Sequence, residues 1–146
     1  MDAKFIYLTQ SDTTAGLLSA DPFRLNQIKG RQPYKPILAE VDCYETLKKF
    51  TRVPVLFRNR VRRSQKTTFI YPNHQSFRVV KDESHLMFLR KFSIMYSSSA
   101  NKTGSVFDIQ EAIKMCDIIV IDSRGIFAGI PSKIFKINKI KIKKIR

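Results

Sequence analysis

Short strand-like and helix-like segments alternate along this chain, and no long linker separates them. Segments with strand character are 4–8, 37–41, 67–71, 76–80, 94–97, 117–122, 132–137 and 139–145. Helical spacing or capping residues mark 22–30, 44–50, 53–61 and the segments that begin at Ser84 and Asp108. Such alternation is typical of an α/β (α+β) domain. At 146 residues, the length predicts one domain spanning 1–146.

Local patterns refine several of these segments. Asp21 followed by Pro22 is typical of a helix N-cap and the first helical position. The polar, threonine-rich stretch 10–16 predicts a loop after the first strand. The apolar run 117–122 predicts a buried central strand. The Ile-Lys alternation near the C-terminus predicts an edge strand with one exposed basic face.

The charge balance points to anionic partners. The chain has 27 Lys and Arg against 12 Asp and Glu, a formal net charge of +15. Such an excess attracts polyanions over a distance, so nucleic acid, nucleotides and anionic lipid are the candidate partners. A basic surface that serves only solubility is the alternative. Basic residues are densest in 60–66 and in 133–146, where seven positive charges occur with no acidic residue.

Other compositional features exclude several kinds of site. Cys43 and Cys116 lie far apart with no CxxC, which predicts two buried reduced thiols rather than a disulfide framework or zinc site. His74 and His85 are the only histidines, too few for a histidine-rich metal site. No apolar run approaches ~18 residues, so we expect no membrane span. The N-terminus lacks the pattern of a signal peptide, and we expect a cytoplasmic protein.

Three polar segments next to strand or helix ends are the candidate functional loops. They are 11–17 (SDTTAGL), 29–36 (KGRQPYKP) and 97–104 (SSSANKTG). The cations Lys29, Arg31 and Lys35 can converge on a triphosphate. A serine- and asparagine-rich loop offers hydroxyls and backbone N–H groups to an anion or a ribose. P-loop, dinucleotide-binding and zinc-protease motifs are absent.

The order and spacing of these segments resemble the YrdC-like family, whose best-known members are threonylcarbamoyl-AMP synthases. That family carries K-x-R early and S-x-N late, which correspond to Lys29/Arg31 and Ser99/Asn101. The S-T-S-A-N-x-S-G segment of the family is similar to 97–104, which is the most specific match. Further matches are 11–17 to T-D-T-V-Y-G-L, 129–132 to G-x-P-S-T, 68–70 to T-F-V and 76–79 to A-V-R-x-P.

The resemblance implies a fold and a reaction. The fold is a twisted mixed β-sheet with flanking helices around a concave basic cavity. The reaction joins L-threonine, bicarbonate and ATP into L-threonylcarbamoyl-AMP with release of pyrophosphate. The adenylate then supports threonylcarbamoyl adenosine formation in tRNA, through downstream threonylcarbamoyl-transfer proteins. Some members bind double-stranded RNA, so tRNA or double-stranded RNA is an expected partner. Mg²⁺ is expected to bridge the ATP phosphates, with no protein metal site.

The resemblance implies a role for each residue that stands at a position of the family's motifs. The resemblance assigns the catalytic set to Lys29, Arg31, Ser99 and Asn101. It assigns ATP binding to Arg31, Lys35, His74, Ser99, Asn101 and Arg146. It assigns threonine binding to Thr13, Arg78, Ser97 and Ser132.

Departures from the family pattern leave two functions open. The family's P-G-P-x-T becomes Gln65-Lys66-Thr67-Thr68, and Val80 stands where A-V-R-x-P has proline. The retained Lys29, Arg31, Ser99 and Asn101 favour a compact threonylcarbamoyl-AMP synthase. The lost prolines and high basicity favour a non-catalytic relative that binds RNA or nucleotide. A basic ribosome-associated protein outside the family is the third alternative.

Overall fold

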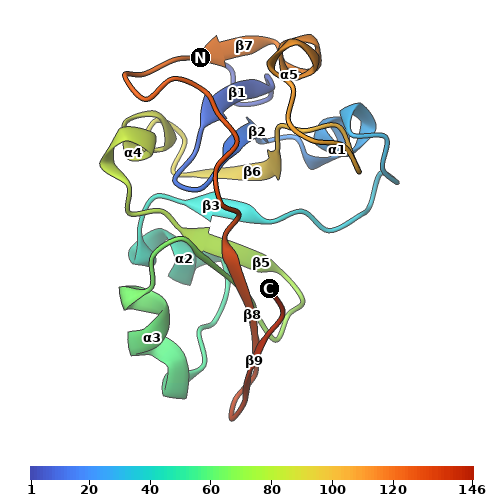
Figure 1. Cartoon of the computed structure of the whole chain (residues 1–146). Helices are drawn as coiled ribbons and strands as arrows, with labels where there is room; N and C mark the ends of the chain where they lie inside the picture. The colour runs from blue at the N-terminus through green and yellow to red at the C-terminus, as the bar shows by residue number, and fades with distance from the viewer.

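The computed structural model describes residues 1–146 and contains one nine-stranded mixed sheet, which confirms the expected mixed α/β architecture (Figure 1). The strands run in the order β7-β1-β2-β6-β3-β5-β4-β8-β9. Their bounds are β1 Tyr7–Gln10, β2 Ala15–Ser19, β3 Ala39–Val41, β4 Thr67–Ile70, β5 Ser76–Val79, β6 Ile94–Ser99, β7 Ile118–Val120, β8 Lys133–Ile137 and β9 Ile142–Lys144.

Short helices surround this sheet. They are α1 Pro22–Ile28, α2 Tyr44–Phe50, a 3₁₀ turn η1 Val55–Phe57, α3 Arg58–Arg63, α4 Glu83–Leu89 and α5 Ile109–Met115. Asp21 caps α1 as expected, because its Oδ1 accepts a hydrogen bond of 3.2 Å from the Arg24 N–H. Asp108 caps α5 in the same way, through the Gln110 N–H. No helix has both the length and the apolar character needed to span a bilayer.

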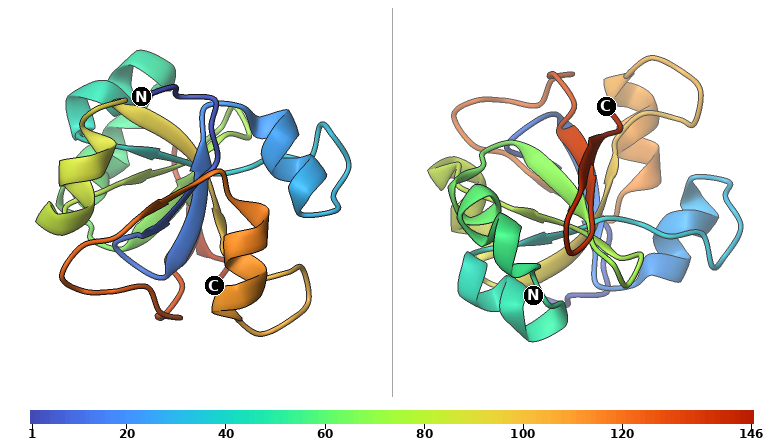
Figure 2. Two further views of the ribbon diagram at one scale, coloured as in Figure 1. Left: turned by 90° about the horizontal axis from the view of Figure 1, so that it is seen from above. Right: turned by 90° about the horizontal axis from the view of Figure 1, so that it is seen from below.

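The strand register separates two faces of the sheet. One face, here called the apolar face, continues from Leu17 through Phe77 and Phe69 to Phe135. α1 and α5 pack on its β1–β2 end, and α2 and α3 pack on its β4–β5 end (Figure 2). The other face, here called the mixed face, continues from Leu18 to Glu40 and Arg78. α4 covers part of this face, and polar side chains occupy the rest.

Two sequence expectations about strands were wrong. The polar, threonine-rich stretch 10–16 was expected to be loop, but β2 begins within it at Ala15 and continues to Ser19. Pairing with β1 on one side and β6 on the other makes it a central strand that is buried throughout. β7, expected to be central, is an edge strand that pairs only with β1, and Ile119 is 40% exposed.

The C-terminal hairpin confirms the expected basic edge strand. β9 pairs only with β8, and Lys143 and Lys144 are exposed. The backbone N–H groups of Ile145 and Arg146 both donate to the Ile134 carbonyl, so two residues oppose one. This arrangement is that of a β-bulge, which shifts a side chain to the opposite face of the strand. Arg146 consequently reaches back to Ser132.

The thiols differ from expectation. Cys43 and Cys116 are free, as expected, but Cys43 is exposed and Cys116 is only partly buried. Cys43 precedes α2 as its N-cap residue, and its side chain turns outward beside Thr46. Cys43 therefore lies outside the apolar core, whereas Cys116 packs against the part of the core formed by β1, β2, α1 and α5.

Candidate functional site

A cavity of about 480 Å³ opens where β2, β6, β5 and the C-terminal segment meet. It contains eight of the residues assigned from the resemblance: Thr13, Arg31, Arg78, Ser97, Ser99, Asn101, Ser132 and Arg146. These residues come from loops and strands spread over the whole chain. Sheet pairing of β2 with β6 and of β3 with β5 brings them together.

Arg31 is held at the cavity by the turn that follows α1. Gly30 adopts a φ of +66°, a left-handed conformation that favours glycine. The Arg31 N–H then donates to the Asn26 carbonyl at 2.8 Å. The buried Asn26 side-chain amide donates to the carbonyls of Pro33 and Lys35, both at 3.0 Å, and fixes the rest of the turn. The Arg31 guanidinium donates to Ser98 Oγ at 2.7 Å, which joins the cation to the serine-rich strand.

Lys29 lies behind the cavity wall. Its side chain is buried, and its ammonium donates to the carbonyl of Ser99 at 2.7 Å and to the carbonyl of Asn101. Burial, helped by the charge of Arg31, lowers the pKa of Lys29 to about 8. Lys29 therefore braces the 99–101 loop, so that Ser99 and Asn101 remain at the cavity.

A tight turn between β1 and β2 forms another wall. Ser11 Oγ accepts from the N–H groups of Thr13 and Thr14 at 3.1 and 3.2 Å. Gly129 packs directly on this turn, because an added Cβ would lie 2.0 Å from the Thr13 carbonyl oxygen. Arg124 donates to the carbonyls of Gln10 and Ser11 at 2.9 and 3.0 Å. Residues 124–129 thus tie the C-terminal segment to the loop that carries Thr13.

Ser132 and Arg146 complete the cavity from the C-terminal side. Ser132 Oγ lies 2.8 Å from Thr68 Oγ1 in β4. The Arg146 guanidinium donates to the Ser132 carbonyl at 3.0 Å and lies 3.3 Å from its Oγ. Burial, helped by the nearby charge of Arg78, lowers the pKa of Arg146. Two guanidinium groups, those of Arg78 and Arg146, therefore face the same cavity.

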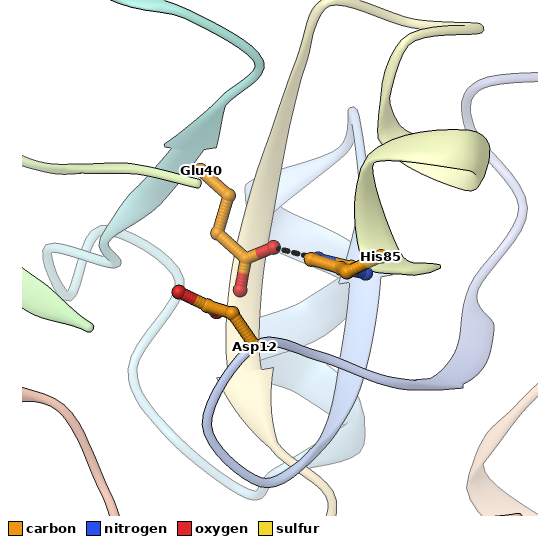
Figure 3. Close-up of side chains that lie close together, drawn as sticks. All are labelled: Asp12, Glu40 and His85. Carbon is orange, nitrogen blue, oxygen red and sulfur yellow. Dashed lines mark hydrogen bonds and ion pairs between the residues drawn. The ribbon is translucent and has the colours of Figure 1, made fainter. Parts of the chain in front are cut away.

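Arg78 rests on a buried charge network. Its Nε donates to Asp12 Oδ1 at 3.1 Å, and its Nη2 donates to Glu40 Oε1. His85 from α4 lies on the far side of Glu40, with Nε2 2.5 Å from Glu40 Oε2 (Figure 3). Burial acts to raise the pKa of Glu40, but Arg78 and His85 outweigh it and hold that pKa at about 2. Burial raises the pKa of Asp12, against the opposing effect of Arg78.

Lys35 and His74 lie outside this cavity. Both line a neighbouring hollow of about 610 Å³, together with aromatic residues that include Phe23, Tyr34 and Phe50. His74 follows β4 in a turn, where it adopts a φ of +68°. The structure therefore does not bring these two residues together with Arg31, although the resemblance placed all three on ATP.

Comparison with known proteins identifies the fold through solved structures, whereas the sequence comparisons found no match. No protein-family model matches the chain, and no curated protein matches it. Sua5 of P. abyssi complexed with L-threonine superposes with a TM-score of 0.80 over 97% of this chain, at 15% identity. YciO of E. coli superposes with a TM-score of 0.77 over 98% of this chain, at 16% identity. The chain has the YrdC-like fold.

The extent of the match differs among proteins that share the YrdC-like fold. The chain corresponds to 82% of YciO but to only 50% of the Sua5 chain. HypF, in a phosphate- and nucleotide-bound form, is similar with a TM-score of 0.75 and 16% identity. That match covers 97% of this chain and 26% of HypF. The chain thus spans about half the length of Sua5 and about a quarter of the length of HypF.

The Asp12–Glu40–His85 cluster lies beneath the cavity and was not foreseen from the sequence. The contacts to Arg78 and His85 join residues 38 to 66 positions apart in the chain. In the sequence, the one sign of this cluster was Glu40, a single acidic residue within the predicted strand 37–41. One ligand atom from each member of the cluster lies within 4.8 Å of the others, the spacing of a metal site. Arg78 already contacts both carboxylates, so this cluster balances the guanidinium charge.

Proposed function

We propose that this chain belongs to the YrdC-like family and is an L-threonylcarbamoyl-AMP synthase. The observation that carries the proposal is the cavity itself, which gathers three guanidinium groups and many hydroxyls but is lined by no Asp or Glu. Such a lining suits anions with several oxygen atoms. Arg31, Arg78 and Arg146 would neutralise the charges of ATP and of a threonine carboxylate or carbamate. Complexes of similar folds with L-threonine, in Sua5, and with nucleotide, in HypF, support the same assignment.

The reaction assigned to this cavity balances in two steps. The threonine amine and bicarbonate form a carbamate with loss of water. A carbamate oxygen then attacks the α-phosphorus of ATP, a new P–O bond forms, and the bond to the β-phosphate oxygen breaks. Pyrophosphate leaves, and L-threonylcarbamoyl-AMP remains. Downstream threonylcarbamoyl-transfer proteins would use this adenylate to modify tRNA, in the cytoplasm.

The residues divide the work by their position around the cavity. Arg31, Ser99 and Asn101 would hold the phosphates on the α1 side, with Lys29 supporting the 99–101 loop from behind. Thr13, Arg78, Ser97 and Ser132 would hold threonine on the opposite side, with Arg146 between the two groups. Charge neutralisation and positioning account for catalysis, because both reactants are anionic and no side-chain nucleophile is needed.

The side chains of this cavity do not form a binding site for Mg²⁺ on their own, so the ion would enter bound to the nucleotide. Hard divalent cations prefer oxygen ligands, above all carboxylates. The cavity is lined by hydroxyl groups but by no Asp or Glu side chain. Mg²⁺ would therefore be held by the ATP phosphates and would neutralise part of their charge. Ser99 and Asn101 are the neighbouring oxygen donors that could contact its hydration shell.

The proposal is tested by pyrophosphate release. With ATP, bicarbonate, threonine and Mg²⁺, we expect release that disappears when threonine is omitted. Arg31→Ala should retain the fold but bind ATP about 10- to 100-fold more weakly, because it loses a charge-assisted contact. Lys4→Ala, which removes an exposed cation that does not line the cavity, is the matched control. Threonine-independent release, or unchanged ATP affinity in Arg31→Ala, would contradict the proposal.

A second candidate is a non-catalytic protein that binds RNA or nucleotide. One observation favours it: Lys29, assigned to the phosphates by resemblance, donates instead to two backbone carbonyls. ATP binding without pyrophosphate release under the same conditions, together with tight binding of tRNA or double-stranded RNA, would select this candidate.

A further inference from the structure

Two of the three guanidinium nitrogens of Arg78 are bound within the protein. Nε donates to Asp12 Oδ1 at 3.1 Å, and Nη2 donates to Glu40 Oε1. The third nitrogen, Nη1, lies 3.5 Å from Thr68 Oγ1, which is too long for a strong hydrogen bond. Arg78 also lines the cavity, so a ligand there can reach the guanidinium. Contact with that ligand therefore falls mainly to Nη1.

The direction of Nη1 depends on the Glu40 carboxylate. A guanidinium is planar, so holding Nε and Nη2 also fixes Nη1. Glu40 is fully buried and binds Nη2 through Oε1, while its other oxygen, Oε2, lies 2.5 Å from His85 Nε2 (Figure 3). Burial acts to raise the pKa of Glu40, but Arg78 and His85 hold it at about 2. The carboxylate is therefore ionised and accepts both hydrogen bonds, and His85 Nε2 carries the hydrogen of the second.

Packing alone does not explain a histidine at position 85. The side chain is fully buried, and its ring stacks on Phe88 with centroids 6.3 Å apart, next to Leu86 and Leu89. Its Nδ1 is buried and has no hydrogen-bond partner. A buried polar atom without a partner costs stability, so a leucine would suit these surroundings better. The hydrogen bond to Glu40 is what the imidazole adds at this position.

We propose that His85 is a positioning residue, which acts through Glu40 to direct Arg78 Nη1 toward the carboxylate of an amino-acid ligand. His85 does not line the cavity, so it would act without touching that ligand. This role rests on the proposed function, in which Arg78 binds threonine. A hydrogen bond weakens steeply as its angle closes, so a rotation of the guanidinium would remove the contact. Arg31 lies outside this network, so ATP affinity should not depend on His85.

His85→Leu tests this role, because it removes the Nε2–H donor and places an apolar side chain among apolar neighbours. Threonine affinity, measured by calorimetry, should decrease about tenfold, the effect of losing a hydrogen bond to a charged group. In pyrophosphate release, the KM for threonine should rise by the same factor, and the KM for ATP should not change. His85→Gln retains a side-chain N–H donor and should recover most of the affinity.

Phe88→Leu is the matched control. It changes the packing of α4 beside the same imidazole ring but leaves the hydrogen bond to Glu40 in place. It should lower the free energy of unfolding without changing threonine affinity. His85→Met, whose unbranched side chain adapts to irregular space, replaces the leucine variant if that variant does not fold.

The Nε–H signal of Arg78 in an NMR spectrum reports on the guanidinium without any ligand. Its loss in Arg78→Lys assigns the signal. Because this N–H is buried and bonded to Asp12, it should exchange slowly with water. The signal should shift or broaden in His85→Leu and stay in place in Phe88→Leu.

Loss of threonine affinity without loss of ATP affinity, a shifted Arg78 signal and recovery in His85→Gln would together support the positioning role. An unchanged Arg78 signal in His85→Leu, or an equal loss of threonine affinity in Phe88→Leu, would overturn it. An original protein that binds no threonine would contradict the proposed function instead. The Arg78 signal would then decide the positioning role by itself.

Discussion

Arg78 shows how a single residue can connect the fold to the proposed chemistry. It is 3% exposed, yet it lines the cavity, so its charge needs internal compensation. Asp12 and Glu40 supply that compensation, and His85 orients Glu40 from behind. Removing one member of a buried ion pair leaves the other charge uncompensated, which is strongly destabilising. The network therefore both stabilises the sheet and fixes the direction of the guanidinium.

Glu40→Gln should destabilise the protein by about 3 kcal/mol at pH 7, because Arg78 loses a buried partner. The folded-state pKa of Glu40, about 2, lies below the value of about 4.3 expected in the unfolded chain. Its contribution is therefore complete above about pH 4.3 and is lost as the pH falls toward about 2. Urea unfolding at pH 7 and at pH 3 measures this difference between the variant and the original protein.

The control for this prediction is Glu83→Gln, which removes the exposed partner of Arg90. An exposed ion pair contributes little, so this change should cost less than about 1 kcal/mol. If Glu40→Gln and Glu83→Gln have equal effects at pH 7, the buried network does not stabilise Arg78 as described. The same conclusion follows if the effect of Glu40→Gln does not shrink in acid.

At the scale of elements, the segment between β7 and β8 connects the two halves of the site. Arg124 attaches it to the β1–β2 turn through two backbone carbonyls. Gly129 lets it approach the same turn so closely that no side chain fits between them. Ser132 then enters the cavity at the start of β8. This segment has no regular secondary structure, but its contacts determine the distance between Thr13 and Ser132.

Gly129→Ala should displace this segment from the turn, because its Cβ would lie 2.0 Å from the Thr13 carbonyl oxygen. Such overpacking costs about 1–3 kcal/mol. The unfolding free energy and the affinity for threonine, measured by calorimetry, should both decrease. Ile130→Ala is the control, because Ile130 is 86% exposed beside it. Threonine affinity that is unchanged in Gly129→Ala would show that the contact does not shape the site.

Elements also show what the sequence can and cannot predict. Helix caps such as Asp21 and Asp108 are local signals, so the helices they begin were predictable. β2 was not, because its strand conformation depends on two partners distant in sequence rather than on its own residues. β7 has the composition of a central strand but lies at the edge. Edge or centre is a property of topology, which local composition does not encode.

The residues of the candidate site were predictable only in part. Eight assigned residues line one cavity. They could be predicted because the motif segments of the resemblance match this chain in the same order along its length. Lys35 and His74 do not meet them, because the turn after α1 directs Lys35 to the neighbouring hollow. Glu40 and His85 were missed because each is an isolated polar residue within an otherwise ordinary element. Their relation appears only when α4 folds against β3.

The charges of the whole molecule are unevenly distributed, because residues 46–81 and 123–146 contain 18 Lys and Arg and no Asp or Glu. Arg78 and Arg146 lie in these acid-free segments and also line the cavity. The remaining residues have a small excess of acidic groups, with 12 Asp and Glu against 9 Lys and Arg. Such an asymmetry orients the approach of a polyanion.

Mass spectrometry can show whether this protein makes an adenylate from the three proposed substrates. The protein is incubated with ATP, threonine, Mg²⁺ and ¹³C-labelled bicarbonate, and the products are analysed at early times. We expect threonylcarbamoyl-AMP that carries one ¹³C atom, accompanied by pyrophosphate, and much less of both products with Arg31→Ala at the same ATP concentration. A protein that binds ATP and threonine but forms no labelled adenylate would contradict it.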